Sequence, residues 1–153
     1  MARPTKIQNY LKIAKTVSER STCMRRHYGA VIVSDDGIIS TGYNGSARGE
    51  ENCCDRGTCK RIENDVPHGS DYSDCFSIHA ENNAILEAGR YRCKGATLYL
   101  YGESASTGET EEDMQPCKAC MRLINNVGIK KIIMGTPEKY RILDYNSARR
   151  NFM

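Results

Sequence analysis

The chain has 153 residues, of which 39% are apolar, enough for one domain with a core and too few for two typical domains. Lysine and arginine number 22 against 19 acidic residues, and a formal net charge of +3 excludes the strong basic excess of a dedicated nucleic-acid-binding protein. No apolar run approaches the roughly 20 residues that span a bilayer, so we expect one cytoplasmic domain over residues 1–153 with neither a membrane nor nucleic acid as partner.

The N-terminal part of the chain predicts a helix followed by a hairpin. From Lys6 to Glu19 apolar residues recur every three or four positions, which is the period of an amphipathic helix with one face on a sheet. Gly29–Val33 and Ile38–Thr41 are short runs rich in β-branched residues, and the Asp-Asp-Gly sequence between them favours a turn. We therefore expect two antiparallel strands here.

Residues 45–77 show neither helical nor strand periodicity. Glycine, asparagine, aspartate and cysteine are frequent there, so the segment has little apolar area with which to hold its shape. We expect a long loop that another kind of interaction must stabilise.

The second half of the chain alternates helices with strands. Helices are expected over Ala80–Ala88 and Lys118–Val127, each followed by a glycine, and strands over Ala96–Tyr101 and Lys130–Met134. Residues 102–115 are polar and locally acidic, which predicts a surface excursion. The alternation predicts a three-layer α/β/α sandwich, and the initial hairpin makes its central sheet of about five strands a mixed one.

Two short motifs at the starts of these helices have the composition of a metal centre. His79 begins a His-Ala-Glu sequence, and Cys117 and Cys120 belong to a Pro-Cys-Lys-Ala-Cys sequence. Cysteines at this spacing lie on one face of a helix, and the helix dipole and a bound metal both lower the pKa of their thiols. Two thiolates and one imidazole suit zinc and leave its fourth tetrahedral position open for water. We therefore predict a catalytic zinc ion on His79, Cys117 and Cys120.

Glu81 is not needed as a ligand and is predicted to be the catalytic residue. Zinc lowers the pKa of bound water from about 15.7 to about 7. A carboxylate beside His79 can take the proton of that water, deliver it to a ring nitrogen and later protonate departing ammonia. His-x-Glu followed by Pro-Cys-x-x-Cys is the signature of zinc deaminases. The alternative is that the histidine and the two cysteines are merely packed in the core. In that case the joint occurrence of the two motifs would be a coincidence.

With these motifs the chain resembles the cytidine and deoxycytidylate deaminase superfamily, and within it the deoxycytidylate deaminases of bacteria and phages. The similarity also includes Ser21-Thr-Cys, Gly29-Ala-Val-Ile-Val and the Gly-Tyr-Asn-Gly sequence around Asn44, and it extends to about Met134. It implies a cytidine deaminase-like fold and the hydrolysis of dCMP to dUMP and ammonia, which feeds thymidylate synthesis. The reaction would take place in the cytoplasm, or in the host cytoplasm if the protein is viral.

Two other classes of function share these motifs. A deaminase of nucleic acid, or of another free nucleoside or base, has the same zinc motifs, but the modest charge and the acidic segment near Pro116 disfavour a strand of phosphates. A non-catalytic, zinc-stabilised accessory protein of the competence type keeps the fold without turnover, but it has no use for Glu81 beside an open metal position.

The resemblance also implies residues that contact the substrate. Asn44 is expected in the pocket beside the sugar or base, although an Asn-Gly pair also forms tight turns without a ligand. Ala80, inside the His-Ala-Glu motif, is expected at the substrate as well. Arg26 is a candidate for the phosphate and Tyr140 for stacking on the base. The alternative for both is an ordinary surface side chain.

Some members of the family carry a structural zinc ion in the loop before the His-Ala-Glu motif. The resemblance implies four cysteine ligands for it here: Cys23, Cys53, Cys59 and Cys75. Such a site would give residues 45–77 the stabilisation that they lack. Cys54 and His68 are alternative ligands, a set of unlinked thiols is the alternative to the whole site, and Cys93 is expected as a buried thiol.

Regulation and assembly follow from the resemblance alone. It implies a homohexamer that dCTP activates and dTTP inhibits, with Mg²⁺ assisting the nucleotide effector. Shorter relatives pass almost directly from the strand to the Pro-Cys motif, so residues 102–115 depart from the family pattern at a place that bears on the pocket and on subunit contacts.

Overall fold

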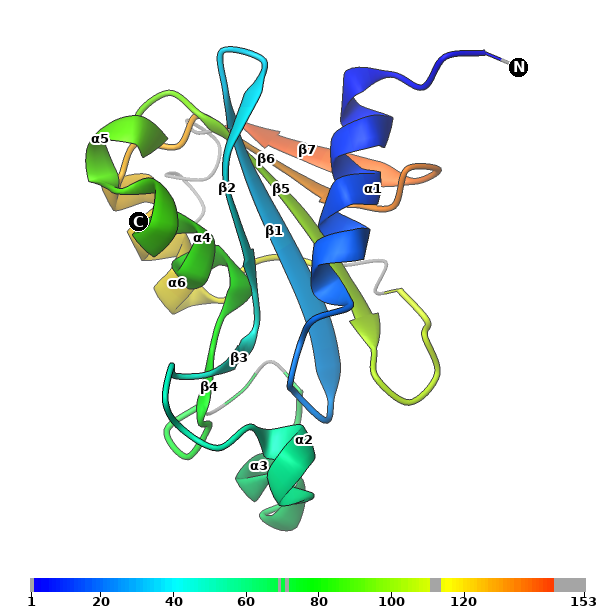
Figure 1. Ribbon diagram of the computed structural model, residues 1–153, viewed down its shortest axis with the longest axis vertical. Coiled ribbons are helices and arrows are strands. Elements are labelled where there is room, and N and C mark those ends of the chain that lie inside the picture. The colour runs from blue at the N-terminus through cyan, green and yellow to red at the C-terminus, as the bar shows by residue number, and fades with distance from the viewer. Residues whose placement is uncertain (1, 69, 71, 111–113, 145–153) are drawn as a thin grey trace.

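A computed structural model of the chain describes residues 2–68, 70, 72–110 and 114–144. It has the predicted three-layer arrangement, in which a mixed sheet of five strands lies between α1 on one face and α4, α5 and α6 on the other (Figure 1). In the described part of the chain, no helix has the length and apolarity that crossing a bilayer requires.

The sheet has the strand order β2-β1-β5-β6-β7. Strand β1 (Arg26–Ser34) pairs antiparallel with β2 (Gly37–Tyr43) on one side and with β5 (Thr97–Ser104) on the other. Strand β6 (Lys131–Gly135) is parallel to β5, and β7 (Tyr140–Asp144) is antiparallel to β6. The hairpin and the strand–helix–strand unit that the sequence predicts are therefore both present, and β7 is an additional edge strand.

One face of the sheet is covered by α1 (Lys6–Ser18). Thr5 and Gln8 form a capping box at its first turn, which satisfies backbone donors that no helical carbonyl can reach. Leu11 and Ala14 of the helix are fully buried. They belong to one apolar cluster with residues of three strands: Val31, Val33, Tyr99, Tyr101 and Ile133.

The opposite face is covered by α4 (Ala80–Ala88), the short α5 (Arg90–Cys93) and α6 (Lys118–Asn126). Because side chains alternate along a strand, the core residues on this face interleave in sequence with those under α1. They include Ala30, Ile32, Leu98, Leu100, Ile132 and Met134. Gly42 of β2 lies directly against α4, since a Cβ atom there would stand 2.5 Å from both Ala80 O and Ala84 N. The sheet therefore fixes the position of the α4 backbone closely.

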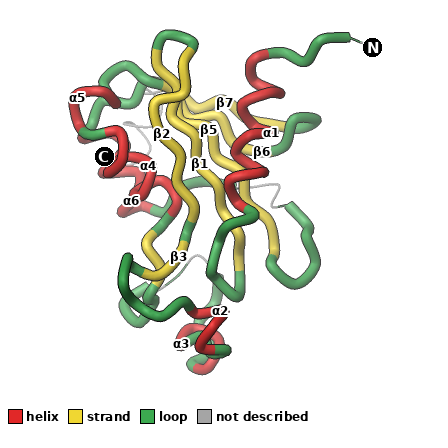
Figure 2. The backbone as a smooth tube through the Cα atoms, in the orientation of Figure 1, coloured by secondary structure: helices red, strands yellow, loops and turns green. Residues whose placement is uncertain are grey.

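The described residues of the segment 45–77, which exclude 69 and 71, lie at one end of the sandwich (Figure 2). They begin with β3 (Gly45–Ser46), which pairs antiparallel with β4 (Ser77–Ile78). Between these two strands stand the one-turn helices α2 (Cys53–Arg56) and α3 (Lys60–Glu63). The β3–β4 pair closes the loop directly before His79, so the conformation of the loop affects the position of His79.

The expected excursion at residues 102–115 is in part continuous with the sheet. Strand β5 runs on to Ser104 instead of ending at Tyr101, because residues 102–104 pair with residues 26–28 of β1. The chain then turns back, and the backbone N–H of Ser104 donates to the carbonyl of Glu109 at 2.8 Å. Met114 is buried at 2% exposure, so the segment re-enters the core before Pro116. Residues 111–113, with most of the acidic run, lie outside the described residues.

Candidate metal centre

The three side chains predicted to bind a metal converge where α4 and α6 begin. His79 is the N-cap residue of α4, Cys117 is the N-cap residue of α6, and Cys120 lies in the first turn of α6. Their donor atoms all lie within 4.8 Å of one another. His79 Nδ1 is 3.1 Å from Cys120 Sγ and 3.6 Å from Cys117 Sγ. Among the described residues, this is the one group of His, Cys, Asp and Glu side chains that is close enough to share a metal ion.

The spacing of these atoms fits zinc. With Zn–S bonds of about 2.3 Å and Zn–N bonds of about 2.0–2.1 Å, tetrahedral coordination separates a nitrogen from a sulfur by about 3.5–3.6 Å. The imidazole nitrogen is 3.6 Å from Cys117 Sγ, which matches this value, and 3.1 Å from Cys120 Sγ, which is about 0.5 Å shorter. Three protein ligands of these types therefore suit a zinc ion with one further position for a small ligand.

The two thiols of the group share a hydrogen bond, which shifts the pKa of each in opposite directions. The hydrogen bond with Cys120 lowers the pKa of Cys117 to about 4, with a further contribution from His79. The same hydrogen bond raises the pKa of Cys120, as do burial and the nearby Glu81. One of the two thiols is therefore stabilised as a thiolate, and zinc binding would release the proton that the pair retains.

Glu81 lies in the first turn of α4 and is buried, with 4% of its surface exposed. It is not a member of the ligand group. Burial raises the pKa of its carboxyl group, and the thiol of Cys120 is a hydrogen-bond neighbour of that group. A raised pKa makes a carboxyl group better able to accept and return a proton near neutral pH.

A pocket of about 580 Å³, including the part open to solvent, adjoins the metal group. His79, Glu81 and Cys117 line this pocket. Its lining also includes four basic side chains: Arg25, Arg26, Arg61 and His68. An anionic group of a ligand would therefore meet positive charge close to the metal position.

Asn44 lines the pocket and is 5% exposed. Its side-chain oxygen accepts hydrogen bonds from the backbone N–H of Tyr28 at 2.9 Å and from Ser21 Oγ at 2.5 Å. Its side-chain nitrogen donates to the carbonyl of Arg26 at 2.9 Å. Asn44 therefore fixes the start of β1 at the edge of the pocket.

The other residues expected at the substrate are placed differently. Arg26 lines the pocket, whereas Ala80 is fully buried under β2 and does not line it. Tyr140 begins the edge strand β7 and is not at the pocket either. Two tyrosines also line it, Tyr28 and Tyr72, and the sequence predicted a substrate contact for neither. Tyr28 could be placed only with the N-terminal extension of β1, and Tyr72 belongs to a loop without periodicity.

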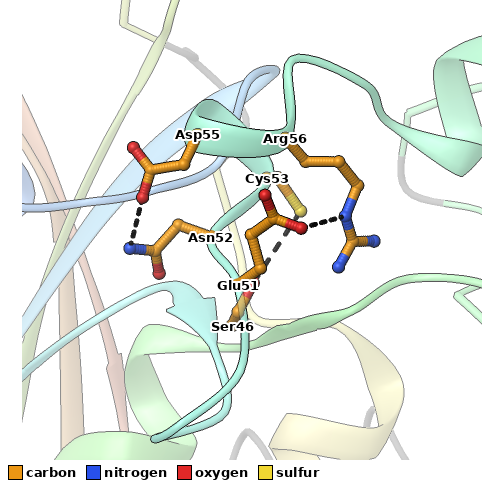
Figure 3. Close-up of polar contacts among 6 residues, drawn as sticks. All are labelled: Ser46, Glu51, Asn52, Cys53, Asp55 and Arg56. Atoms are coloured by element: carbon orange, nitrogen blue, oxygen red, sulfur yellow. Dashed lines mark hydrogen bonds and ion pairs between the residues drawn. The ribbon is translucent and has the colours of Figure 1, made fainter.

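The four cysteines expected to bind a second zinc ion are neighbours in the loop region. Cys53 is buried at the start of α2, with its Sγ 3.9 Å from Ser46 Oγ (Figure 3). Burial raises the pKa of Cys53, and the nearby thiols of Cys23, Cys59 and Cys75 raise it further. In the described part of the chain, these four do not form a ligand group of the kind that includes His79.

Polar contacts on both sides of Cys53 hold α2 in place (Figure 3). Asn52 Nδ2 donates to Asp55 Oδ2 at 3.1 Å, and Arg56 Nε lies 3.5 Å from Glu51 Oε2. The two alternative ligands, Cys54 and His68, are both exposed, and His68 also lines the pocket. Cys93, in contrast, is fully buried in the core.

Comparisons with known proteins agree with this geometry. Residues 4–136 match the family model of the cytidine and deoxycytidylate deaminase zinc-binding region. The chain is 38% identical over 138 residues to the deoxycytidylate deaminase of Mycobacterium phage D29, a match that covers 87% of this chain and 96% of that protein. It is 36% identical over 134 residues to the deoxycytidylate deaminase of Schizosaccharomyces pombe, which covers 88% of this chain but 38% of the yeast protein. The chain thus spans less than half of the yeast relative.

A solved structure with a similar fold is the dCMP deaminase of cyanophage S-TIM5 in complex with dCMP and dUMP. It superposes with a TM-score of 0.61 at 26% sequence identity, and the match covers 88% of this chain and 83% of that one. The apo form of the same phage protein gives a TM-score of 0.62 at 25% identity, over 88% of this chain and 86% of that one.

Proposed function

Because the chain belongs to the cytidine and deoxycytidylate deaminase family, we propose that it hydrolyses dCMP to dUMP and ammonia. One observation carries the proposal: His79, Cys117 and Cys120 converge at a pocket that Glu81 also lines. In the reaction, the oxygen of one water molecule replaces the amino nitrogen on C4 of the cytosine ring, and the nitrogen leaves as ammonia.

A zinc ion on these three side chains would offer a fourth position to water and lower the pKa of that water to about 7. Glu81 takes the first proton of the attacking water and delivers it to ring nitrogen N3. It then takes the second proton and transfers it to the amino group, which leaves as neutral ammonia. Burial of Glu81 keeps bulk water from competing for these protons.

The basic lining of the pocket favours a nucleotide over a nucleoside. We assign the substrate phosphate to Arg26 and the sugar or base to Asn44, both of which line the pocket. The hydrogen bond from Asn44 to the carbonyl of Arg26 couples the two. Arg25 also lines the pocket, and its Nη1 donates to the carbonyl of Val66 at 2.8 Å. Ala80 and Tyr140 receive no role in this assignment.

A substrate panel tests the proposal. The zinc-loaded protein is assayed for ammonia release with dCMP, deoxycytidine, CMP, cytidine and single-stranded DNA. We expect dCMP to be the preferred substrate, and Arg26→Gln to raise KM for dCMP while leaving the rate with deoxycytidine unchanged. Preference for a nucleoside without phosphate, or for DNA, contradicts the proposal.

A second, structural zinc ion on Cys23, Cys53, Cys59 and Cys75 is part of the same proposal. It is supported by the resemblance and by the position of Cys53, whose pKa the nearby thiols of Cys23, Cys59 and Cys75 raise. Elemental analysis should give two zinc ions per chain for the wild-type protein and one for Cys53→Ser. A wild-type content of one zinc ion per chain refutes this second site.

Regulation and assembly complete the proposal on the ground of the resemblance. The protein is then a cytoplasmic homohexamer that dCTP activates and dTTP inhibits, with Mg²⁺ bound to the nucleotide effector. Light scattering and dCMP turnover, each measured with and without the two nucleotides and Mg²⁺, test this directly. A monomer whose rate ignores both nucleotides contradicts it.

A further inference from the structure

A buried arginine lies close to the metal centre. Arg61 of α3 is only 5% exposed, and a buried guanidinium is costly unless its charge and its donors are met. Its Nη2 donates to the carbonyl of Pro67 at 2.9 Å and to that of Ser70 at 3.0 Å. Its Cζ lies 4.2 Å from the ring centroid of Tyr72, a cation–π distance. The loop is therefore folded around this guanidinium, with the Tyr72 ring against it.

The same tyrosine ring contacts the metal ligand His79. The ring centroids of Tyr72 and His79 are 4.8 Å apart and the planes meet at 77°, a favourable edge-to-face arrangement. The Nδ1 atom of His79 faces the two sulfurs of the metal group. An imidazole can turn about its side-chain bonds, and few of its orientations aim Nδ1 in this direction. The Tyr72 ring restricts that freedom.

We propose that Arg61 and Tyr72 are positioning residues of the metal centre. The guanidinium holds the Tyr72 ring, and the ring holds the imidazole of His79 in the orientation that aims Nδ1 at Cys117 and Cys120. An edge-to-face contact between aromatic rings changes an equilibrium constant by about 2- to 10-fold, so its loss should lower metal affinity by a factor of that size. The inference rests on the proposed function only in requiring that His79, Cys117 and Cys120 bind the metal.

Two simpler roles for these residues lead to different results. If Arg61 and Tyr72 only stabilise the loop, their removal lowers thermal stability and leaves the metal centre unchanged. If they only contact the substrate, since both line the pocket, their removal raises KM and leaves the substrate-free protein unchanged. A measurement on the bound metal without substrate therefore separates positioning from both of these roles.

The test uses protein loaded with cadmium-113, whose NMR signal reports the ligands and the geometry of each site. A site of two sulfurs and one nitrogen gives a signal apart from that of a four-sulfur site, and titration with a chelator measures the affinity of each. Tyr72→Leu removes the ring, and Tyr72→Phe retains it. The matched control is Phe76→Leu, because Phe76 carries Arg56 at 4.5 Å in the same loop. Arg61→Met is a second variant in case Tyr72→Leu does not fold.

We expect Tyr72→Leu to shift the two-sulfur signal and to weaken cadmium binding at that site about 2- to 10-fold. Arg61→Met should move the same signal, whereas Tyr72→Phe and Phe76→Leu should not. An unchanged signal and affinity in the folded Tyr72→Leu or Arg61→Met protein overturns the inference, and so does an equal shift in Phe76→Leu. If the wild-type protein binds cadmium at this site but its zinc-loaded form does not act on dCMP, the proposed function alone is refuted.

Discussion

Replacing Gly42 by alanine should displace the helix that carries Glu81. A Cβ atom at this position of β2 would lie 2.5 Å from Ala80 O, 2.5 Å from Ala84 N and 3.1 Å from Ala84 Cα, and contacts under 3.0 Å are essentially never seen. All three atoms belong to the backbone of α4, so no side chain can move aside. The helix must shift by about half an ångström, which typically costs about 1–3 kcal/mol in a packed core.

The assay follows stability and turnover together. A loss of about 1–3 kcal/mol lowers Tm by about 2–4 °C per kcal/mol in a domain of this size. Misplacement of catalytic groups by about 1 Å can cost about 100-fold in rate, so a shift of about half that size predicts a fall in kcat of about 10-fold. Calorimetry measures the first effect, and ammonia release from dCMP, measured below the lowered Tm, gives the second.

Two glycines of the same hairpin serve as controls. At Gly29, a Cβ atom would overlap the backbone of Ala14 in α1, on the opposite face of the sheet, so Gly29→Ala should lose stability without a comparable loss of kcat. At Gly37, a Cβ atom would meet nothing closer than Ser34 O at 3.6 Å, so Gly37→Ala should be close to neutral. The reasoning is refuted if Gly42→Ala is as stable as Gly37→Ala, or if Gly29→Ala loses as much kcat as Gly42→Ala.

Three further predictions concern single side chains. Cys93 is fully buried and burial raises its pKa, so it should react with a thiol reagent far more slowly than the exposed Cys54. Mass spectrometry after limited alkylation measures which of the two cysteines is labelled first, and equal labelling contradicts the prediction. Burial, with help from Glu103, raises the pKa of Tyr101 from 10.0 to about 12. The unfolded chain therefore ionises this phenol first, and stability that is complete below pH 10 should fall by up to about 3 kcal/mol as the pH rises toward 12. Urea unfolding across this range should show the loss in the wild-type protein and not in Tyr101→Phe, and equal losses in the two proteins argue against it. Asn44→Ala removes the hydrogen-bond partners of the Tyr28 N–H and the Arg26 carbonyl of β1, so it should lower the free energy of unfolding by about 1–3 kcal/mol with zinc content unchanged. An unchanged free energy of unfolding contradicts the prediction.

Local patterns were sufficient to predict the elements that carry the metal centre. Helix α4 spans Ala80–Ala88 as expected, because apolar periodicity and the following Gly89 mark it from within the sequence. The spacing of Cys117 and Cys120 at a helix start likewise predicted that they lie together. Helix α4 and the cysteine pair depend on residues that are close in sequence, whereas His79 meets the cysteines through the packing of α4 beside α6 on one face of the sheet.

Features that depend on distant contacts were not predictable. Strand β7 escaped prediction because four of its five residues are exposed and its pattern lacks apolar alternation, so only pairing with β6 defines it. The extension of β1 to Arg26 depends in the same way on pairing with residues 102–104 of β5. Arg61 and Tyr72 reach the metal centre through a loop without periodicity, so no local signal indicates their role.

The turnover of Glu81→Gln at known zinc content tests the central claim most directly. Glutamine keeps the size of the side chain but cannot carry a proton, and the loss of a general acid–base group costs about 10²- to 10⁴-fold in rate. We predict that ammonia release from dCMP falls by about this factor while the zinc content per chain equals that of the wild-type protein. A Glu81→Gln protein that retains zinc and deaminates dCMP at the wild-type rate would contradict the account.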